Sequence, residues 1–192
     1  MILLIDLAAV LLLVLFRLLV GFPVRVKGSS MIPTLRERQL LWVRRTRRFH
    51  RGDIVICHFP NRYRGKHKLI PQLFVKRLIG LPGETLTLRD GHLFIDGVCL
   101  EETYLPSRRS VYSALSRSWT LGEGQFFVMG DNRPFSHDCR RIGPLDRSLI
   151  VGRVSAVLLP TAAFHHFTPP EYPVMQAEDV PENMTKQAEI VS

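Results

Sequence analysis

Residues 73–80 read LFVKRLIG, and this stretch indicates a buried β-strand that carries two cations. Branched and aromatic side chains dominate it, as is typical of strands. Because side chains alternate between the two faces of a strand, Phe74, Lys76 and Leu78 share one face. Burial among apolar groups disfavours the charged form of a lysine. The stretch therefore predicts a β-strand with Lys76 on an apolar face. Two readings stay open here: a lysine whose amine extends to the surface, which is the usual case, and a buried base with a lowered pKa.

Further β-type runs lie on both sides of this strand. Runs rich in branched and aromatic residues cover 40–43, 53–59, 125–129 and 150–159. Residues 85–96 contain two such runs around an Asp-Gly pair, which is typical of a tight hairpin turn. No long stretch of this region has a strong 3.6-residue period. We therefore expect a mainly β domain over residues 23–162.

The charge of the 192-residue chain is concentrated in its middle. Residues 23–167 hold 24 basic and 11 acidic side chains, a net charge of +13, whereas residues 168–192 have a net charge of −4. A basic body suggests an anionic partner, either a nucleic acid or an acidic lipid surface. An apolar fraction of 46% excludes a wholly disordered chain.

Residues 1–22 form an apolar segment whose charged side chains are Asp6 and Arg17. As a helix, 22 residues reach ~33 Å, about the thickness of a bilayer's hydrocarbon core. A removable signal peptide would have a basic start and a small-x-small cleavage site, and the segment has neither. We expect a permanent single membrane anchor rather than a buried amphipathic helix. Taken alone, Arg25 and Lys27 just after it favour a cytoplasmic body.

The remaining regions offer no chemistry of their own. Residues 163–192 are predicted to be an acidic, disordered tail, and the basic loop 60–72 has no assigned role. Cys57, Cys99 and Cys139 lack a C-x-x-C pair, so we expect small buried thiols. The seven histidines lack metal-ligand spacing. We predict no metal and no cofactor.

Four segments together carry a stronger signal: 28–35 (GSSMIPTL), 51–55 (RGDIV), 75–84 (VKRLIGLPGE) and 130–140 (GDNRPFSHDCR). Each alone is weak, since a Ser-Met-x-Pro-Thr sequence is usually a capped turn. In this order behind an apolar N-terminal segment, they resemble the type I signal peptidases, or leader peptidases, the membrane-bound Ser–Lys proteases of the S26 family. The resemblance runs from residue 1 to about 160.

The resemblance implies a signal-peptidase-like β catalytic domain preceded by one N-terminal transmembrane helix. It places a single-pass protein in the cytoplasmic membrane with the catalytic domain on the extracytoplasmic side, against the expectation from charge alone. It also implies a small inserted β-hairpin region at about 85–125.

The implied function is removal of N-terminal signal peptides from exported preproteins, with cleavage after small residues at the −3 and −1 positions. The substrate would lie extended beside the β domain. The implied partners are preprotein signal peptides and a bilayer containing anionic lipids, with no nucleic acid.

The implied catalytic residues are Ser30, Lys76 and Ser136. Ser30, which precedes Met31, would be the nucleophile, with Ser29 as its local rival. Lys76 would be the general base, because a serine hydroxyl is a poor nucleophile until a base takes its proton. The hydroxyl of Ser136 would orient the lysine amine.

The oxyanion of the tetrahedral intermediate needs hydrogen-bond donors. The resemblance assigns the backbone N–H of Ser30. Gly28 stands where some members carry a hydroxyl, so we expect that side-chain donor to be missing, with Ser29 as a possible substitute.

Other residues near the site are expected to be structural, with carboxylate–guanidinium pairs that include Arg77. Arg77 itself cannot be the base, since a guanidinium does not deprotonate at usable pH. Met31 should lie near the membrane surface, and Pro33 should restrain its loop. Members often carry Asp-Asn where this chain has residues 134–135, and Ser at position 139. The structural set is Met31, Pro33, Arg77, Asp131, Arg133, Asp138 and Arg140.

Two alternatives remain open. One is a specialised Ser–Lys processing peptidase of the same fold, such as a pilus or conjugation maturation enzyme. The other is a basic module that binds membranes or nucleic acid through residues 44–48, RRTRR. No aromatic-interleaved or helix-turn-helix signature supports specific nucleic-acid binding. Salt-dependent binding that survives loss of Ser30 and Lys76 would favour the binding module.

Overall fold

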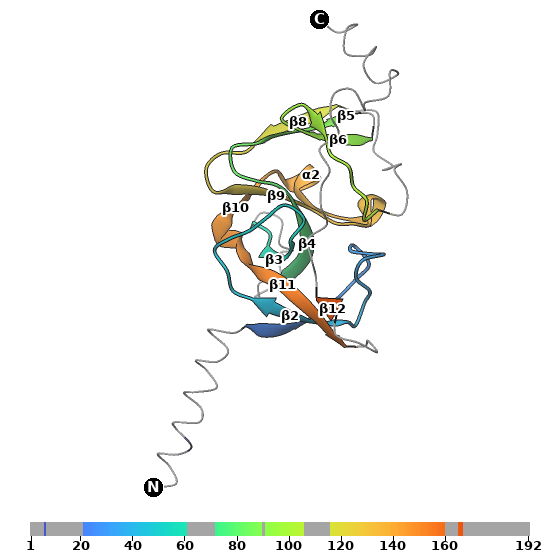
Figure 1. Ribbon diagram of the computed structural model, residues 1–192, viewed down its shortest axis with the longest axis vertical. Helices are drawn as coiled ribbons and strands as arrows, with labels where there is room; N and C mark the ends of the chain where they lie inside the picture. Colours follow the sequence, from blue (N-terminus) through green and yellow to red (C-terminus); the bar gives the residue numbers. More distant parts are fainter. Residues whose placement is uncertain are drawn as a thin grey trace, which may run out of the picture.

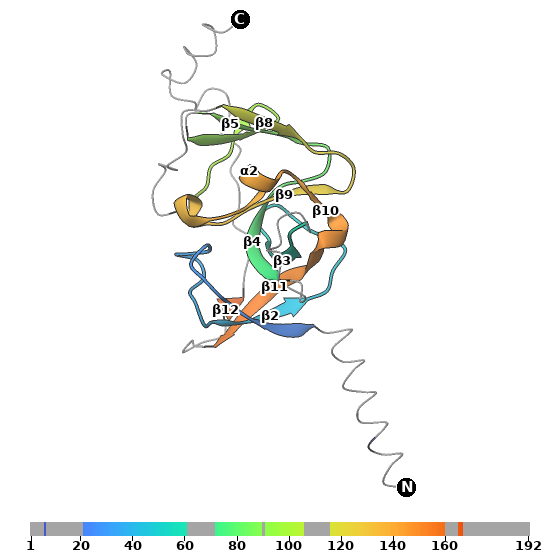
Figure 2. The ribbon, with the colours of Figure 1, turned by 180° about the vertical axis from the view of Figure 1, so that it is seen from behind.

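The computed structural model describes residues 6, 21–60, 72–89, 91–105, 116–159 and 165–166, and these form two antiparallel sheets. The large sheet has the strand order β1-β2-β11-β3-β4-β9-β10, with β12 beside β11; the small sheet has the order β7-β6-β5-β8. The small sheet lies at one end of the body and β2 at the opposite end, in both views of the ribbon (Figures 1 and 2).

The strands are β1 (Phe22–Arg25), β2 (Leu40–Arg44), β3 (Ile54–His58), β4 (Leu73–Gly80), β5 (Thr85–Arg89), β6 (His92–Ile95), β7 (Val98–Cys99), β8 (Arg117–Thr120), β9 (Gln125–Met129), β10 (Leu145–Asp146), β11 (Ile150–Leu159) and β12 (His165–His166). Three short helical segments follow β9: η2 (Arg133–Phe135), α2 (Cys139–Ile142) and η3 (Arg147–Leu149).

The longer strands confirm the sequence predictions. The runs at 40–43, 53–59, 125–129 and 150–159 form β2, β3, β9 and β11. The Asp-Gly hairpin is also present, with β5 and β6 paired so that Arg89 lies opposite His92. In each of these runs the apolar residues either alternate with polar ones or form a continuous buried stretch. Both patterns can be recognised within a few residues of sequence.

The edges of the domain differ from the prediction. Phe22 belongs to β1 and pairs with Val43, so the boundary drawn between residues 22 and 23 falls inside a strand. At the other end, β12 pairs with Ala156 and Val157 of β11. This strand ends at His166, four residues past the predicted limit of 162. Both edge strands are short and are held by their neighbours, which a local pattern does not reveal.

The predicted transmembrane helix falls almost wholly outside the described residues, as does most of the predicted acidic tail. Among the residues that are described, none of the helices has the length and apolar character needed to span a bilayer. The three cysteines are free and buried, as expected.

Strand β3 is buried on both faces because apolar side chains cover each side of the large sheet. Ile54 and Ile56 pack in one cluster, which includes Met31 and Leu35 from the segment after β1. Val55 and Cys57 point the other way, into the cluster that contains the apolar face of the small sheet. The strands in the middle of the large sheet are therefore shielded from water on both sides.

Strand β4 lies between β3 and β9 in this shielded region. Its Lys76 pairs with Val55 of β3, and its Arg77 pairs with Met129 of β9. The exposed start of β4 leads into a fully buried second half, from Lys76 to Gly80. Two cations are thus carried into the interior by the central strand, and the site is built around them.

The end of β4 requires a residue without a side chain. A Cβ on Gly80 would lie 2.5 Å from Leu86 Cδ1, 2.8 Å from Leu121 Cδ1 and 3.0 Å from Phe127 Cβ. We predict that Gly80→Ala lowers the free energy of unfolding by ~1–3 kcal/mol, the usual effect of overpacking a dense core. Urea denaturation followed by circular dichroism measures this change.

The matched control for that prediction is Gly122→Ala. A Cβ on Gly122 would meet Gln125 Oε1 no nearer than 3.3 Å, and the residue is exposed. Its effect should stay within ~0.5 kcal/mol. Equal stability of the two variants would contradict the packing argument.

Candidate active site

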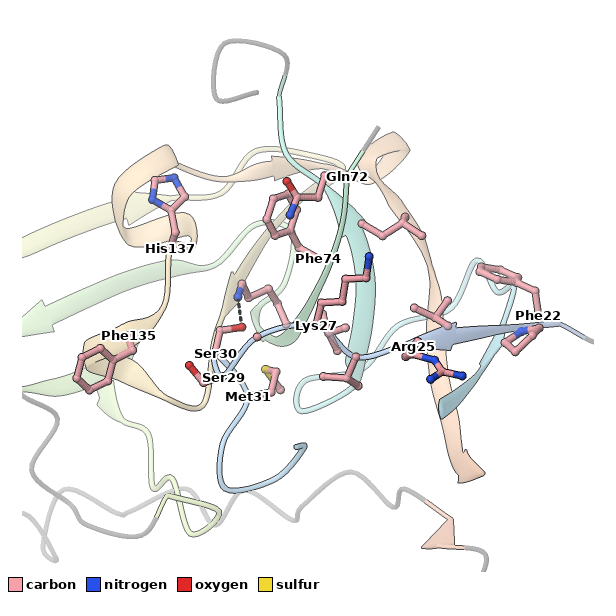
Figure 3. Close-up of a pocket in the computed structure, with 17 residues that line it drawn as sticks. Phe22, Arg25, Lys27, Ser29, Ser30, Met31, Gln72, Phe74, Phe135 and His137 are labelled. Atoms are coloured by element: carbon pink, nitrogen blue, oxygen red, sulfur yellow. Dashed lines mark hydrogen bonds between the residues drawn. The ribbon is translucent and has the colours of Figure 1, made fainter. Parts of the chain in front are cut away.

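The side chains of Ser30 and Lys76 meet at the surface of the large sheet. Lys76 Nζ donates a hydrogen bond to Ser30 Oγ over 2.7 Å, across 46 residues of sequence. The dashed line in Figure 3 marks this contact. Lys76 is 2% exposed, so water reaches the amine poorly. The structure thus brings together the two residues that the sequence predicted as base and nucleophile.

A compact turn after β1 presents the serine. The N–H of Ile32 donates to the Ser29 carbonyl over 3.1 Å, and the N–H of Leu35 donates to the Met31 carbonyl over 2.8 Å. Met31 and Leu35 fix the turn, since both are buried in the same apolar cluster. The peptide bond between Ile32 and Pro33 is cis.

Met31 packs into the protein, with a side chain that is 2% exposed. The expectation that this edge lies near the membrane surface stays a prediction. The neighbouring Ile32 is 42% exposed. In a turn, successive side chains point in different directions, so an apolar pair such as Met31 and Ile32 divides between the core and the surface.

Burial lowers the pKa of Lys76 below its usual value, and this is the largest effect on that group. The charges of Asp138 and Asp131 oppose the shift, while that of Arg140 reinforces it. Cys57 lies close enough to couple to the lysine, but burial raises the pKa of its thiol to about 12. The thiol therefore stays neutral at ordinary pH and does not hold a proton on the amine.

Arg140 forms an ion pair with the Asp138 carboxylate. Arg140 donates from Nε to Asp138 Oδ1 and from Nη2 to Asp138 Oδ2, each over 2.7 Å, and the N–H of Gly130 donates to Oδ2 over 3.0 Å. Burial alone would raise the pKa of Asp138, but these donors hold it below its usual value. Because this charge is already paired, it is a weaker partner for the nearby ammonium form of Lys76.

Ser136 lies in the same pocket with an unused hydroxyl. Its Oγ is buried and has no hydrogen-bond partner among the described residues, although the hydroxyl contributes to lowering the pKa of Asp138. A Cβ on Gly130 would collide with this Oγ and with the carbonyl oxygen of Ser30. The missing side chain at Gly130 thus lets the two serines approach the lysine. In this structure the Lys76 amine donates to Ser30 rather than to Ser136, and the orienting role of Ser136 stays a prediction.

Arg77 and Asp131 brace the serine turn from the other face of β4. Arg77 donates from Nε to Asp131 Oδ1 over 2.9 Å and from Nη2 to Asp131 Oδ2 over 2.7 Å. Thr34 Oγ1 adds a third bond to Asp131 Oδ2, over 2.5 Å. Asn132 completes the brace, with its N–H on the Ser30 carbonyl and its Nδ2 on the Ser29 carbonyl, both over 3.0 Å.

Some of these contacts were not identified from the sequence. Thr34 and Asn132 lie inside the quoted segments, but their bonds to the serine turn depend on tertiary geometry. Arg133 forms a fork with Glu102, which follows β7 in the chain, and its Nη2 also donates to Tyr104 Oη over 3.0 Å. The Arg77 guanidinium lies 4.0 Å from the centre of the Tyr104 ring. No local signal distinguishes Glu102 or Tyr104.

The backbone N–H of Ser30 is available for an oxyanion. It makes no hydrogen bond to any residue that the structure describes. Gly28 adopts a positive φ of 82°, and its N–H faces Glu37 Oε1 over 3.4 Å. The side chain of Ser29 is exposed. Within the described part of the chain, no group of His, Cys, Asp or Glu is arranged to hold a metal ion.

A groove of about 1140 Å³ contains the Ser30–Lys76 contact. Residues 22–31 form one wall and residues 72–76 the other, with Phe135 and His137 beside the serine (Figure 3). Phe135 is 76% exposed. Strand β1 in one wall and the start of β4 in the other are extended, so the groove has a form that accepts an extended peptide.

The chain is similar to several known proteins. A crystal structure of a signal peptidase I from Enterococcus faecalis V583 is 35% identical and matches with a TM-score of 0.45 over 56% of this chain and 97% of that chain. The signal peptidase I of Bacillus licheniformis is 38% identical over 164 residues, covering 79% of this chain and 84% of the relative. Signal peptidase I T of Bacillus subtilis (strain 168) is also 38% identical over 164 residues, covering 79% and 81%.

The family model described as signal peptidase, peptidase S26, matches residues 1–159. That range includes both walls of the groove and all four sequence segments. The chain therefore belongs to the signal peptidase family, peptidase S26.

Proposed function

We propose that this protein is a type I signal peptidase, a serine endopeptidase that removes signal peptides from preproteins with Ser30 as nucleophile and Lys76 as general base. The observation that carries the assignment of these two residues is the 2.7 Å contact between Lys76 Nζ and Ser30 Oγ, made by a buried lysine at the edge of a groove. The family and the named relatives support the substrate class.

The reaction begins with Lys76 in its neutral form. Its lone pair accepts the proton of the Ser30 hydroxyl as Oγ attacks the carbonyl carbon of the scissile bond. The free N–H of Ser30 is placed to donate to the resulting oxyanion. Lys76 then gives the proton to the leaving amine, and an acyl-enzyme on Ser30 remains for hydrolysis by water.

The substrate would bind as an extended strand between the two walls of the groove. Residues 22–31 and 72–76 supply backbone on both sides. Cleavage after small residues at −3 and −1 fits a binding mode in which alternate side chains of the peptide point toward the enzyme.

The location would be the cytoplasmic membrane, with residues 1–20 as a single-pass anchor and the catalytic domain on the extracytoplasmic side. The apolar sequence of this segment supports the anchor. Strand β1 begins at Phe22, which puts one wall of the groove directly after the segment.

Single substitutions test the two catalytic roles. We predict that Ser30→Ala and Lys76→Ala each lower kcat/KM for a preprotein with an Ala-x-Ala site by ~10³-fold or more, since each removes a member of a unit that acts together. Cleavage by detergent-solubilised protein, followed on gels and by N-terminal sequencing of the product, measures this.

The control for that experiment is Ser29→Ala, which alters an exposed hydroxyl one residue away. It should stay within about threefold of the wild type, a small effect on the scale of transition-state interactions. Full activity of Lys76→Ala would disprove the dyad, and loss of activity in Ser29→Ala with retention in Ser30→Ala would exchange the two serines.

The pH dependence follows from the lowered pKa of Lys76. The neutral amine is the reactive form, so kcat/KM should fall as the pH drops through that pKa. Because the shift is downward, the fall should come below the 10.5 of an ordinary lysine. A pH series of kcat/KM with a signal-peptide substrate measures it.

His137 lines the same groove, so His137→Gln is the control for that profile. The acid limb should keep its position in this variant. If the fall of kcat/KM at low pH is absent from His137→Gln, the titrating group is the imidazole and not Lys76.

The orienting role of Ser136 can be separated from a structural one. Ser136 Oγ is buried without a partner among the described residues, so its removal should not destabilise the fold. We predict that Ser136→Ala keeps its thermal midpoint but loses ~10-fold or more in kcat, because the lysine amine loses a positioning contact when substrate is bound. Wild-type kcat would rule out the role, and a lowered midpoint would show a structural one.

A further inference from the structure

Four exposed arginines lie together at the end of β2. Arg44, Arg45, Arg47 and Arg48 all face solvent. None of them forms an ion pair with any residue in the described part of the chain. We call these four residues the arginine loop. Unpaired positive charge at this density favours an anionic partner.

The arginine loop is held in one conformation. Arg147 donates from Nη2 to the Thr46 carbonyl over 2.7 Å and from Nη1 to the Ile150 carbonyl over 3.0 Å. The Arg147 guanidinium also lies 4.5 Å from the centre of the Phe49 ring. Thr46 Oγ1 accepts from the N–H of Arg48 over 3.1 Å. The four charges are therefore presented by a fixed loop.

The neighbouring charges do not neutralise the loop. Desolvation lowers the pKa of Arg147, and the charge of Arg47 adds to this shift, so the two guanidinium groups are close to each other. Arg153, opposite Arg44 in the sheet, is paired with Asp53 over 3.4 Å. The buried Asp53 is thus already engaged, and no other carboxylate in the described part of the chain forms an ion pair with the exposed arginines.

The loop lies where the chain enters the body. Phe22, the first residue of β1, pairs with Val43, and the next residue of β2 is Arg44. Gly21 is so close to the Val43 carbonyl that a Cβ there would collide with it. Arg45 covers Phe22, with its guanidinium 5.5 Å from the centre of the ring. The end of the apolar N-terminal segment and the arginine loop are therefore adjacent.

We propose that the arginine loop binds the phosphates of anionic lipid headgroups and docks the β1–β2 end of the body against the bilayer. The proposal rests on the membrane anchor in the proposed function, which places Phe22 at the bilayer surface. Guanidinium groups suit phosphate because their donors form a planar fork. Each arginine near an anionic surface strengthens partitioning by about fivefold.

Docking would also orient the active site. The wall of the groove formed by residues 22–31 begins at the same Phe22 that Arg45 covers. A body fixed by the arginine loop therefore has one end of its groove at the lipid surface, where a membrane-inserted signal peptide leaves the bilayer.

The experiment uses the full chain in nanodiscs and measures energy transfer from tryptophan to dansyl-labelled headgroups. The chain has two tryptophans: Trp42 on β2, beside the arginine loop, and Trp119 on β8, in the small sheet at the far end of the body (Figure 1). Trp119→Phe leaves Trp42 as the single donor, and this chain is the parent in which the other substitutions are made. Nanodiscs of phosphatidylcholine are compared with nanodiscs that also contain phosphatidylglycerol.

The test variant is R44Q/R48Q, and the charge-matched control is R89Q/R117Q in the small sheet. Phosphatidylglycerol should raise the transfer in the parent and in the control, and high salt should remove the rise as the screening length falls from about 10 Å at 0.1 M to about 3 Å at 1 M. In R44Q/R48Q, docking should weaken by about 25-fold, from two losses of about fivefold each.

Three results would overturn the proposal: the same rise in R44Q/R48Q as in the parent, transfer that does not depend on lipid charge, or a chain that does not enter neutral nanodiscs. Binding of a labelled single-stranded oligonucleotide that needs Arg44 and Arg48, without a lipid effect, would assign the loop to nucleic acid.

The peptidase activity is scored separately from docking. R44Q/R48Q should cleave a preprotein in neutral detergent as fast as the parent, and Ser30→Ala should dock as the parent does. If the parent itself docks but does not cleave the preprotein, the proposed enzyme is refuted and the lipid site stands.

Discussion

The amine of Lys76 loses its water when the large sheet closes around β4, and a buried lysine is costly to keep charged. The rest of the site is arranged so that this cost is not relieved by a counter-ion. Asp138, the carboxylate that opposes the pKa shift of Lys76 most, is engaged by both sides of the Arg140 fork, and the Cys57 thiol stays protonated. Among the described residues, Lys76 donates its hydrogen bond to the hydroxyl of Ser30. The lowered pKa of the base follows from burial, and the neighbouring ion pair of Asp138 helps to preserve it.

The next residue of β4, Arg77, holds the serine turn in place. Because side chains alternate along a strand, Arg77 points away from the lysine and pairs with Asp131, which in turn accepts from Thr34 in the serine turn. A buried ion pair adds little to stability by itself, but losing one partner is strongly destabilising. The Arg77–Asp131 pair therefore serves to hold β4 and the serine turn in one register. Two successive residues thus have different roles. Lys76 supplies the reactive amine, and Arg77 supports the turn that positions Ser30.

Local patterns were sufficient for the long strands and for placing Lys76 on an apolar face, because both depend on alternation within a few residues. The role of Lys76 as a base came from the resemblance. The identity of Ser30 as its partner came from the resemblance, since no periodicity joins residues 46 positions apart. The sequence did not indicate β1, which starts inside an apolar run and contains Pro23, nor the fork between Arg133 and Glu102. Both depend on which neighbour the folded chain supplies. The burial of Met31 depends on its neighbours in the same way, since an apolar residue in a turn can pack inward as well as face a membrane.

The direct passage from the N-terminal segment into β1 fixes a distance. No linker stands between Gly21 and the first sheet pair, and Ser30 follows eight residues after Phe22. Extended chain covers at most about 3.5 Å per residue, so Ser30 lies within about 28 Å of the point where the chain enters the body. Under the proposed membrane anchor, Ser30 therefore lies at most about 28 Å above the lipid surface. This reach is a second requirement on the substrate beside its small residues at −3 and −1, because the cleavable bond must lie within about 28 Å of the end of the substrate's own apolar segment.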